Sequence, residues 1–240
     1  MTFIIPMAGK GSRFIKDGYK LPKYMIEVKG KTLFEYSMDS LPIGIADKII
    51  FICLKEHEKY NVSNFIKEKI NHTNIDIILI DEVTRGQAET VYVAKDHVKD
   101  LDEILIYNID TYFQSKNLKE ALLNASLKCD GILGAFIDET NDDKWSFAKL
   151  NDEQNVIQTT EKEKISNYAL TGLYHFSKAS DFFDIANSWI SNNQTVRNEF
   201  YIAPMYNDLI KQGKKYKLDI TDIFIPLGTP DEVKAFEQTN

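Results

Sequence analysis

The feature that most constrains this fold is a regular alternation of short apolar runs with longer segments of helical period. The runs are too short and too evenly aliphatic for surface helices, so they predict buried strands. Strands that alternate with helices form βαβ crossovers and a mainly parallel sheet. The first half should therefore contain strands at residues 3–6, 48–54, 76–80 and 103–107, with helices at 33–41, 62–70 and 90–98.

The second half has a different pattern, because most of its apolar runs follow one another across short polar turns. This change predicts a mixed sheet, with no internal repeat and no low-complexity linker. A helix is expected at 118–127, then strands at 131–137, 147–150, 156–160 and 169–176, with a further strand at 216–220. Helices at 180–190, 200–211 and 231–236 complete the prediction.

The charge balance limits the partners of this chain. It has 29 basic against 36 acidic residues and a formal net charge of −7. An acidic protein lacks the general attraction to phosphate backbones on which nucleic-acid binding depends, so no nucleic-acid partner is expected. No apolar run approaches the length of a membrane span. With 43% hydrophobic residues over 240 positions, the chain can bury the core of one α/β domain.

The cysteines and the N-terminal segment predict the compartment. Cys53 and Cys129 lie inside apolar runs without CxxC spacing, which indicates buried thiols rather than a zinc site or a disulfide. Residues 1–8 are apolar but short and have no basic flank, so they predict a strand rather than a signal peptide. A reducing, cytoplasmic location is the expectation.

A glycine-rich turn follows the first predicted strand. Gly9 and Gly11 stand there with the cations Lys10 and Arg13, at the sheet edge where α/β proteins bind ligands. Glycines let backbone approach a ligand closely, and exposed amides with nearby cations attract phosphate oxygens. The turn therefore predicts an anion site. The alternative is a tight strand-to-helix turn without a ligand.

Other glycine motifs fit this turn less well. A P-loop needs four residues between its first Gly and Gly-Lys-Ser/Thr, and the dinucleotide fingerprint needs a third small residue where Phe14 stands. Lys23 follows a rigidifying Pro22 shortly before the next predicted helix. Taken alone, Lys23 would be an ordinary surface lysine.

The glycine turn and the Pro22-Lys23 pair together resemble the opening of a known family, the nucleotidyltransferases often called nucleotide-sugar pyrophosphorylases. That opening is a strand, a Gly-x-Gly-x-Arg turn and then a Pro-Lys pair. The resemblance implies that the turn wraps the phosphates of a nucleoside triphosphate and that the lysine holds them near the reacting centre. The residues to which it assigns these contacts are Ala8, Gly9, Gly11, Ser12, Arg13 and Lys23.

The resemblance covers about 225 residues. It implies a single nucleotidyltransferase domain over residues 1–240, with a Rossmann-like, mixed and mainly parallel sheet flanked by helices, as in GT-A folds. Residues 1–115 would be the nucleotide-binding half and residues 116–240 the acceptor-binding half.

Residues 81–88 resemble the family's base-reading loop and the helix start behind it. The resemblance places nucleotide contacts at Asp81, Gly86 and Gln87, with the base stacked on the bare backbone of Gly86. The alternative is a plain helix N-terminus with a favourable acid in its first turn.

Asp110 ends the fourth strand and resembles the family's magnesium-binding aspartate. A hard oxygen ligand at the open edge of the sheet is what Mg²⁺ carried in by a triphosphate requires. A lone Asp after a strand is otherwise a turn former.

Glu161 and Lys162 resemble the Glu-Lys pair that binds the acceptor in this family, the acid at its polar headgroup and the lysine at its phosphate. Lys164 is a further candidate cation. Gly172, on the following strand, matches a glycine that allows close approach of the acceptor. Read without the family, the Glu-Lys-Glu-Lys run would be a solvated charged stretch.

The chain departs from the family pattern at two positions. Many members place a second magnesium-binding Asp before a Gly-Thr-Pro turn, where this chain has Pro226. Asp219 or Asp222 could substitute, or Asp110 could bind Mg²⁺ with only waters and phosphates as its other ligands. Tyr24 also replaces a frequent proline after Lys23, which reshapes the wall beside the phosphates.

The predicted function is transfer of a nucleoside monophosphate from a nucleoside triphosphate, with CTP favoured, to a small phosphorylated acceptor, with release of pyrophosphate. Residues 6–9 and 23–26 look most similar to capsule-biosynthesis members, among them the CTP:phosphoglutamine cytidylyltransferases. Sugar-1-phosphate uridylyl- or thymidylyltransfer is the alternative, and assembly into a homo-oligomer stays open.

Two other classes of function are alternatives to this prediction. A glycosyltransferase normally carries an Asp-x-Asp metal motif, and the second acid is missing from Asp110-Thr111-Tyr112. A non-catalytic nucleotide-binding regulatory protein is the other alternative, made plausible by Pro226. The four histidines are scattered and are expected to have no catalytic role.

Overall fold

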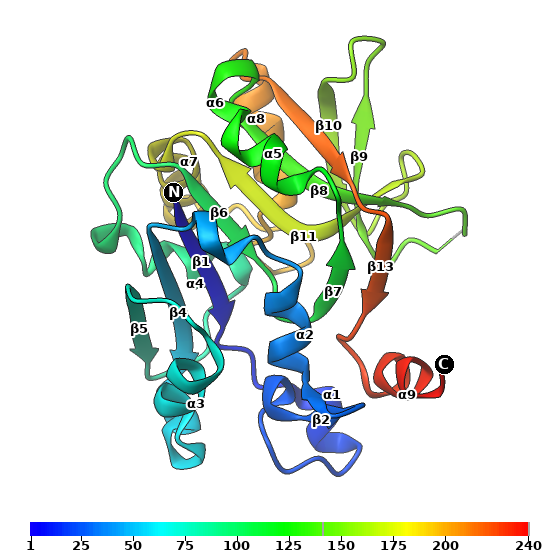
Figure 1. Cartoon of the computed structure of the whole chain (residues 1–240). Coiled ribbons are helices and arrows are strands. Elements are labelled where there is room, and N and C mark those ends of the chain that lie inside the picture. Colours follow the sequence, from blue (N-terminus) through cyan, green and yellow to red (C-terminus); the bar gives the residue numbers. More distant parts are fainter. Residues whose placement is uncertain (141, 240) are drawn as a thin grey trace.

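The structure, a computed structural model, describes residues 1–140 and 142–239. A nine-stranded mixed sheet forms its centre (Figure 1). Strands β1 (Thr2–Met7), β4 (Lys48–Leu54), β5 (Ile75–Ile80) and β6 (Ile104–Tyr107) pair parallel, in the order β6-β1-β4-β5. All four were predicted to within one residue at each end. The parallel half of the sheet is therefore confirmed.

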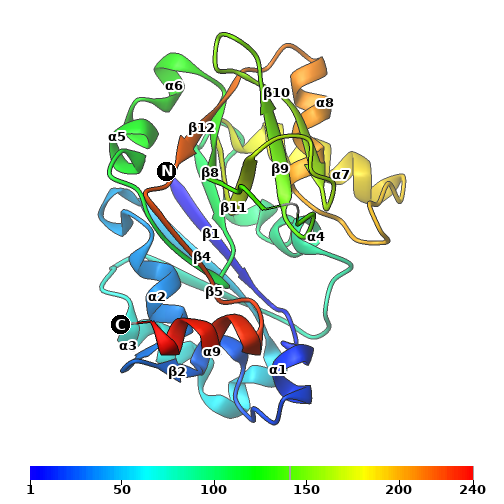
Figure 2. The ribbon, with the colours of Figure 1, turned by 90° about the vertical axis from the view of Figure 1, so that its right-hand side faces the viewer.

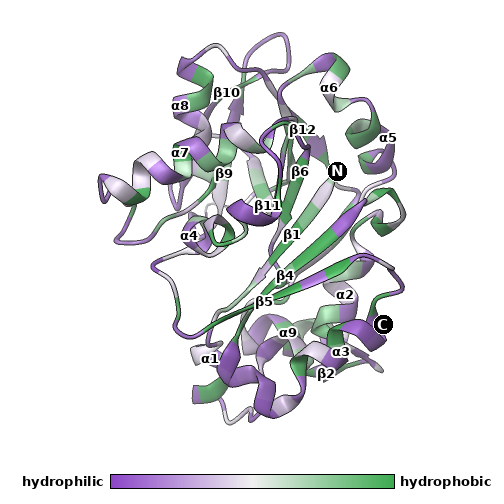
Figure 3. Cartoon of the chain, turned by 90° about the vertical axis from the view of Figure 1, so that its left-hand side faces the viewer, coloured by the Kyte–Doolittle hydropathy of each residue, from purple (hydrophilic) through white to green (hydrophobic). Residues whose placement is uncertain are grey.

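Hydrophobic residues of the central strands alternate between two cores, one on each face of the sheet. Ile4 packs in one core, while Phe3 and Ile5 pack in the other, because successive side chains of a strand point to opposite faces. Helices cover both faces, which explains why these strands are apolar throughout (Figure 3). One face carries α4 (Gln87–Tyr92), α7 (Ala179–Ser191) and α8 (Tyr206–Lys211), and the other α2 (Leu33–Asp39), α3 (Val62–Lys69), α5 (Leu118–Leu123) and α6 (Ala125–Lys128).

The second half extends this sheet as predicted. Strand β11 (Tyr168–Phe176) pairs antiparallel with β6, with β8 (Gly131–Ile137) and with β9 (Ser146–Leu150). Strand β10 (Val156–Glu161) pairs antiparallel with β9, and β12 (Tyr216–Ile220) pairs parallel with β8. The predicted mixed sheet is confirmed.

Two predicted helices have different bounds. The helix expected at 90–98 begins earlier, at Gln87, and ends at Tyr92, with a separate 3₁₀ turn at Lys95–His97. Residues 200–202 are not helical, because the backbone of Phe200 pairs with Arg85 and Ala88; a 3₁₀ turn at Ala203–Met205 leads into α8.

Three further differences concern short elements. The helix expected at 118–127 is divided at Asn124 into α5 and α6. Two antiparallel pairs were not predicted: the hairpin of β2 (Glu27–Val28) with β3 (Lys31–Thr32), and the two-stranded sheet of β7 (Thr111–Gln114) with β13 (Ile223–Pro226). These strands have two to four residues, too few to show a period of alternation.

Helix α9 (Pro230–Gln238) lies near α1 (Ser12–Lys16) below the sheet, at the foot of the view in Figure 2. Phe14 of α1, Leu227 and Val233 belong to one small apolar cluster. Lys234 of α9 also pairs with Asp17 at 2.9 Å. The segment after β13 is thereby held against the glycine turn.

Both cysteines are free thiols. Cys53 is fully buried, and this burial raises its pKa to about 12. Cys129 is partly exposed, because it directly follows α6 and does not lie inside a strand. The prediction of a buried thiol was therefore wrong for Cys129. Over residues 1–140 and 142–239, every helix is too short or too polar to cross a membrane.

Candidate active site

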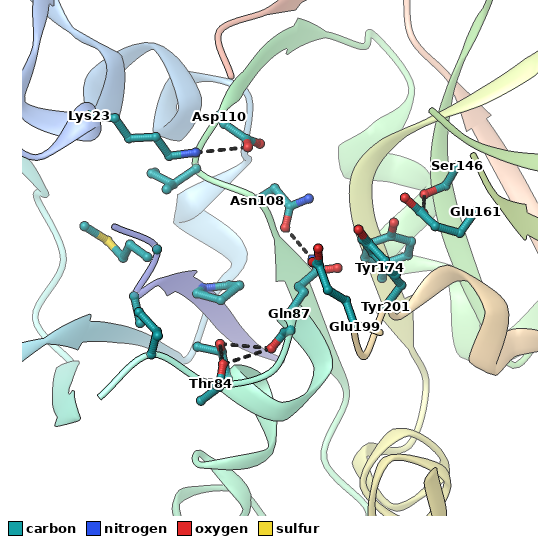
Figure 4. Close-up of a pocket in the computed structure, with 18 residues that line it drawn as sticks. Lys23, Thr84, Gln87, Asn108, Asp110, Ser146, Glu161, Tyr174, Glu199 and Tyr201 are labelled. Carbon is teal, nitrogen blue, oxygen red and sulfur yellow. Dashed lines mark hydrogen bonds and ion pairs between the residues drawn. The ribbon is translucent and has the colours of Figure 1, made fainter. Parts of the chain in front are cut away.

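Two adjoining cavities open at the edge of the sheet where β1 and β6 end. The first, of about 390 Å³, lies between the glycine turn, the start of α4 and the ends of β6 and β10 (Figure 4). The second, of about 350 Å³, lies between β6, β9, β11 and the segment that follows β13. They share five lining residues, so they form one continuous site: Asn108, Asp110, Ser146, Glu161 and Tyr174.

The glycine turn contributes to both cavities. Ala8 and Gly9 line the first cavity, and Arg13 lines the second. Gly11 has φ +64°, a conformation that side chains disfavour, and a Cβ there would lie 3.4 Å from the Cβ of Lys23. Ser12 begins α1, and neither Gly11 nor Ser12 lines either cavity. The turn thus brings most, but not all, of its predicted contact residues to the site.

Lys23 and Asp110 meet at the first cavity, although 87 positions separate them in the sequence (Figure 4). The Lys23 ammonium lies 3.0 Å from Asp110 Oδ2, and the Lys23 side chain is 17% exposed. The pair places one cation and one anion side by side, between the glycine turn and the end of β6. A negatively charged ligand could contact the first, and a divalent cation could contact the second.

A buried hydrogen bond anchors the turn that carries Lys23. The hydroxyl of Tyr24 lies 2.9 Å from His57 Nδ1, and both side chains are buried. Burial raises the pKa of Tyr24 and lowers the pKa of His57. The two groups share one buried hydrogen bond, whose donor is set by the tautomer of the imidazole. The Tyr60 hydroxyl donates to the Lys20 carbonyl at 2.9 Å, which holds the same loop at a second point.

Gly86 is required by the packing of the loop behind it. Its φ is +151°, and a Cβ would lie 2.4 Å from the Phe200 nitrogen. Phe200 in turn donates to the Arg85 carbonyl at 3.0 Å and accepts from the Ala88 amide at 2.9 Å. The predicted stacking of a base on Gly86 stays a prediction, and the close approach of Phe200 gives an independent reason for glycine.

Gln87 lines the first cavity and donates a hydrogen bond to Asn108. Asp81, predicted to contact the nucleotide, lies outside both cavities and pairs with Lys55 at 3.0 Å on the exposed surface. Asp81 directly follows β5, which is the edge strand of the sheet and lies one strand further from the site than β4. In this structure, Asp81 is therefore a surface residue.

Glu161 lies where the two cavities join. Its side chain is 6% exposed, and this burial raises the pKa of the carboxyl group, an effect that a hydrogen bond from the Ser146 hydroxyl opposes. Lys162 lines the second cavity, 4.0 Å from Glu161, and donates to the Tyr201 hydroxyl at 2.8 Å. Lys164 instead pairs with Asp138 at 3.1 Å, so it lines neither cavity.

Gly172 lines the second cavity with φ +86°. A Cβ there would lie 2.7 Å from Asn108 Nδ2. The backbone amide of Asn108 also donates to the Gly172 carbonyl at 3.2 Å. Gly172 therefore makes room for the Asn108 side chain, independently of any acceptor. Asn108 was not among the predicted site residues.

The two acids considered as replacements at Pro226 lie away from the site. Asp219 accepts a hydrogen bond from Ser115 at 3.0 Å, and Asp222 accepts one from the Lys116 amide at 3.0 Å. Neither lines the two cavities. Pro226 and Glu232 do line the second cavity, and Glu232 was not selected from the sequence.

Other lining residues were also missed. Ser146, Tyr174, Glu199 and Tyr201 complete the wall around Glu161 (Figure 4). Tyr201 falls at the start of the helix predicted at 200–211, and Glu199 directly precedes it. Ser146 begins a strand that was placed one residue later. Asn108 alone carried a signal, because it shares a strand end with Asp110.

The described residues contain no group of three or more His, Cys, Asp or Glu side chains that could hold a metal ion. Mg²⁺ does not need one, since it commonly binds one or two carboxylates and completes its shell with waters and substrate phosphates. Asp110 offers such a carboxylate at the junction of both cavities. The donor set therefore fits a magnesium ion delivered with a triphosphate.

Comparison with known proteins agrees with this geometry. The model of the nucleotidyl transferase family matches residues 3–217. The nucleoside-diphosphate-sugar pyrophosphorylase from Vibrio cholerae RC9 is similar in structure, with a TM-score of 0.85, 35% identity, and coverage of 99% of this chain and 100% of that one. The inositol-1-phosphate CTP transferase from T. maritima shares the fold, with a TM-score of 0.74, 14% identity, and coverage of 96% and 90%.

Among curated proteins, the bifunctional protein GlmU of Methanocaldococcus jannaschii is 28% identical over 235 residues, which are 97% of this chain and 52% of that protein. The chain spans about half the length of the curated relatives it matches. The family match covers most of the chain. The chain belongs to the nucleotidyl transferase family.

Proposed function

We propose that this chain transfers a nucleoside monophosphate from a nucleoside triphosphate to a small phosphorylated acceptor and releases pyrophosphate. The observation that carries the proposal is the Lys23–Asp110 pair, placed where the two cavities adjoin. The triphosphate occupies the first cavity, beside the glycine turn. The acceptor occupies the second, beside Glu161 and Lys162.

The reaction needs no protein nucleophile. An acceptor phosphate oxygen attacks the α-phosphorus in line, a new phosphorus–oxygen bond forms, and the bond to the β-phosphate oxygen breaks as pyrophosphate leaves. The acceptor phosphate is already ionised at neutral pH, so catalysis depends on positioning and on neutralising charge. Lys23 offers a cation to the triphosphate in the first cavity, and Arg13 offers a second cation from the wall of the adjoining second cavity.

Asp110 would hold the magnesium ion, which supplies charge neutralisation at the phosphate oxygens. Lys23 then has two partners in turn. It pairs with Asp110 in the free enzyme, as the structure has it, and it contacts phosphate oxygens when the triphosphate binds. Its stem lies on the bare side of Gly11, where a Cβ would come within 3.4 Å of it.

The narrower assignment is to CTP as donor and a capsule precursor as product, with phosphoglutamine among the acceptors considered. The resemblance of residues 6–9 and 23–26 to capsule-biosynthesis members supports it. Uridylyl- or thymidylyltransfer to a sugar-1-phosphate is the alternative. A cytoplasmic location accords with the two free thiols and with the use of a nucleoside triphosphate.

The test is a screen of the ribonucleoside triphosphates and dTTP against phosphorylated sugars, polyols and amino-acid derivatives, with Mg²⁺ and a pyrophosphate assay. We expect one pair to give magnesium-dependent pyrophosphate release. Release of a nucleoside diphosphate from a nucleotide sugar would instead identify a glycosyltransferase. Triphosphate binding without turnover against the whole panel would identify a regulatory protein.

A further inference from the structure

The turn after β13 lies directly against Asp110. Pro226 pairs with Thr111 in the two-stranded antiparallel sheet of β13 and β7, and the Leu227 amide donates to the Asp110 carbonyl at 2.9 Å. Pro226 has no side-chain oxygen to offer a cation. A carboxylate that shares a metal with Asp110 must therefore come from another residue beside this turn.

Glu232, in the first turn of α9, is placed there. A Cβ built on Gly228 would lie 3.5 Å from Glu232 Oε2 and 3.6 Å from Asp110 Oδ2. The two carboxylates thus converge on the same bare side of Gly228, and both line the second cavity. The Glu232 side chain is 19% exposed.

Local contacts hold Glu232 in this position without using up its oxygens. The Gly228 amide donates to Oε2 at 3.0 Å, and the Thr229 hydroxyl caps the helix by accepting from the Glu232 amide at 3.2 Å. Lys144 Nζ is 3.7 Å from Oε1. An ionised carboxylate has about four lone-pair sites, so acceptor capacity remains for a cation or for its bound water.

We infer that Glu232 is the second acidic ligand of the magnesium site, in place of the acid that Pro226 lacks. This rests on the proposed function and completes its metal site. Two carboxylates from facing segments, with waters and phosphates, are a donor set that suits Mg²⁺. Glu232 contacts the ion directly or through one of its waters.

The test measures metal binding rather than turnover. Mn²⁺ replaces Mg²⁺ as the probe, and its free concentration is followed by electron paramagnetic resonance during titration of the full chain with MnCl₂. In Glu232→Gln the amide oxygen still accepts from Gly228, so the turn is kept and only the charge is lost. We expect a loss of Mn²⁺ affinity of about 10- to 100-fold, whether the contact is direct or through water.

Asp231→Asn is the matched control, because Asp231 lies in the same helical turn, is exposed and lines neither cavity. It removes the same charge and should leave Mn²⁺ affinity unchanged. A second variant, Pro226→Asp in the Glu232→Gln background, returns a carboxylate to the family's position. It should restore most of the lost affinity.

Equal Mn²⁺ affinity in Glu232→Gln and the unmodified chain would overturn the inference, as would equal losses in Glu232→Gln and Asp231→Asn. The readout is independent of transfer activity. An absence of pyrophosphate release from the unmodified chain would refute the proposed function, while the Mn²⁺ titration would still decide the role of Glu232.

Discussion

Replacement of Lys23 by Met removes the ammonium that the proposed mechanism places on the triphosphate. Methionine keeps most of the stem, which matters because the Lys23 Cβ lies on the bare side of Gly11, 3.4 Å from where a Cβ on that glycine would be. Two unit charges about 3 Å apart interact by about 5 kcal/mol at an effective dielectric constant of about 20. Part of this is present in the ground state, so the loss in the transition state should be about 3 kcal/mol, or about a hundredfold in kcat.

The same change should hardly affect stability. The Lys23–Asp110 pair is partly solvated, with side-chain exposures of 17% and 37%, and such pairs contribute about 0–1 kcal/mol to folding. We therefore expect turnover and stability to separate. The assay is pyrophosphate release at saturating substrate, together with urea unfolding of the same variant.

Lys55→Met is the matched control, because Lys55 also pairs with an aspartate at 3.0 Å, but outside both cavities. It should leave kcat unchanged. Turnover of Lys23→Met close to that of the unmodified chain would refute the role assigned to Lys23. An equal loss in Lys55→Met would show that the effect is not specific to the site.

Three further predictions concern folding and can be measured by urea unfolding. Gly172→Ala should lower the free energy of unfolding by more than Gly213→Ala does, because both glycines have φ near +87° but only Gly172 has a neighbour, Asn108, within clashing distance. Gly213→Ala, the control, should lose about 1 kcal/mol from backbone strain alone. Equal losses in the two variants would contradict the packing argument. His175 is fully buried, and burial lowers its pKa to about 3. In the unfolded state its pKa is about 6.5, so below this pH the unfolded state binds a proton that the folded state does not. The free energy of unfolding should therefore fall as pH drops below about 6.5. His175→Leu should flatten that part of the profile relative to the unmodified chain, and an unchanged slope would contradict the assignment. Tyr24→Phe should lower the free energy of unfolding by about 1–2 kcal/mol, because it leaves a buried imidazole nitrogen unpaired; no loss would show that this bond does not anchor the loop.

Local sequence was a good guide to the strands of the sheet and a poor guide to short or irregular elements. The strands at β1, β4 and β6 were recognised because burial on both faces leaves a continuous apolar run. The β7–β13 strand pair was missed, since each of its strands has four residues and its pairing joins segments about a hundred residues apart. Yet this strand pair brings Gly228 and Glu232 to Asp110.

The site shows the same division. That Gly9, Arg13, Lys23, Asp110 and Glu161 line one site could be predicted, because a turn or strand end together with a family motif marks each one. Asp81 carries a similar motif, but it lies outside both cavities because its edge strand directs it to the surface. Ser146, Glu199 and Tyr201 carry no local signal that separates them from ordinary polar residues.

By itself, the sequence determined the alternation of elements, the parallel half of the sheet and the glycine turn that begins the site, because these depend on periodicity and on residues with special backbone freedom. Only the tertiary structure decided which acids face Asp110 and why Gly86 and Gly172 are glycines. Those answers depend on atoms that are distant along the chain and come within a few ångströms when the sheet closes, as with Phe200 at Gly86 and Asn108 at Gly172.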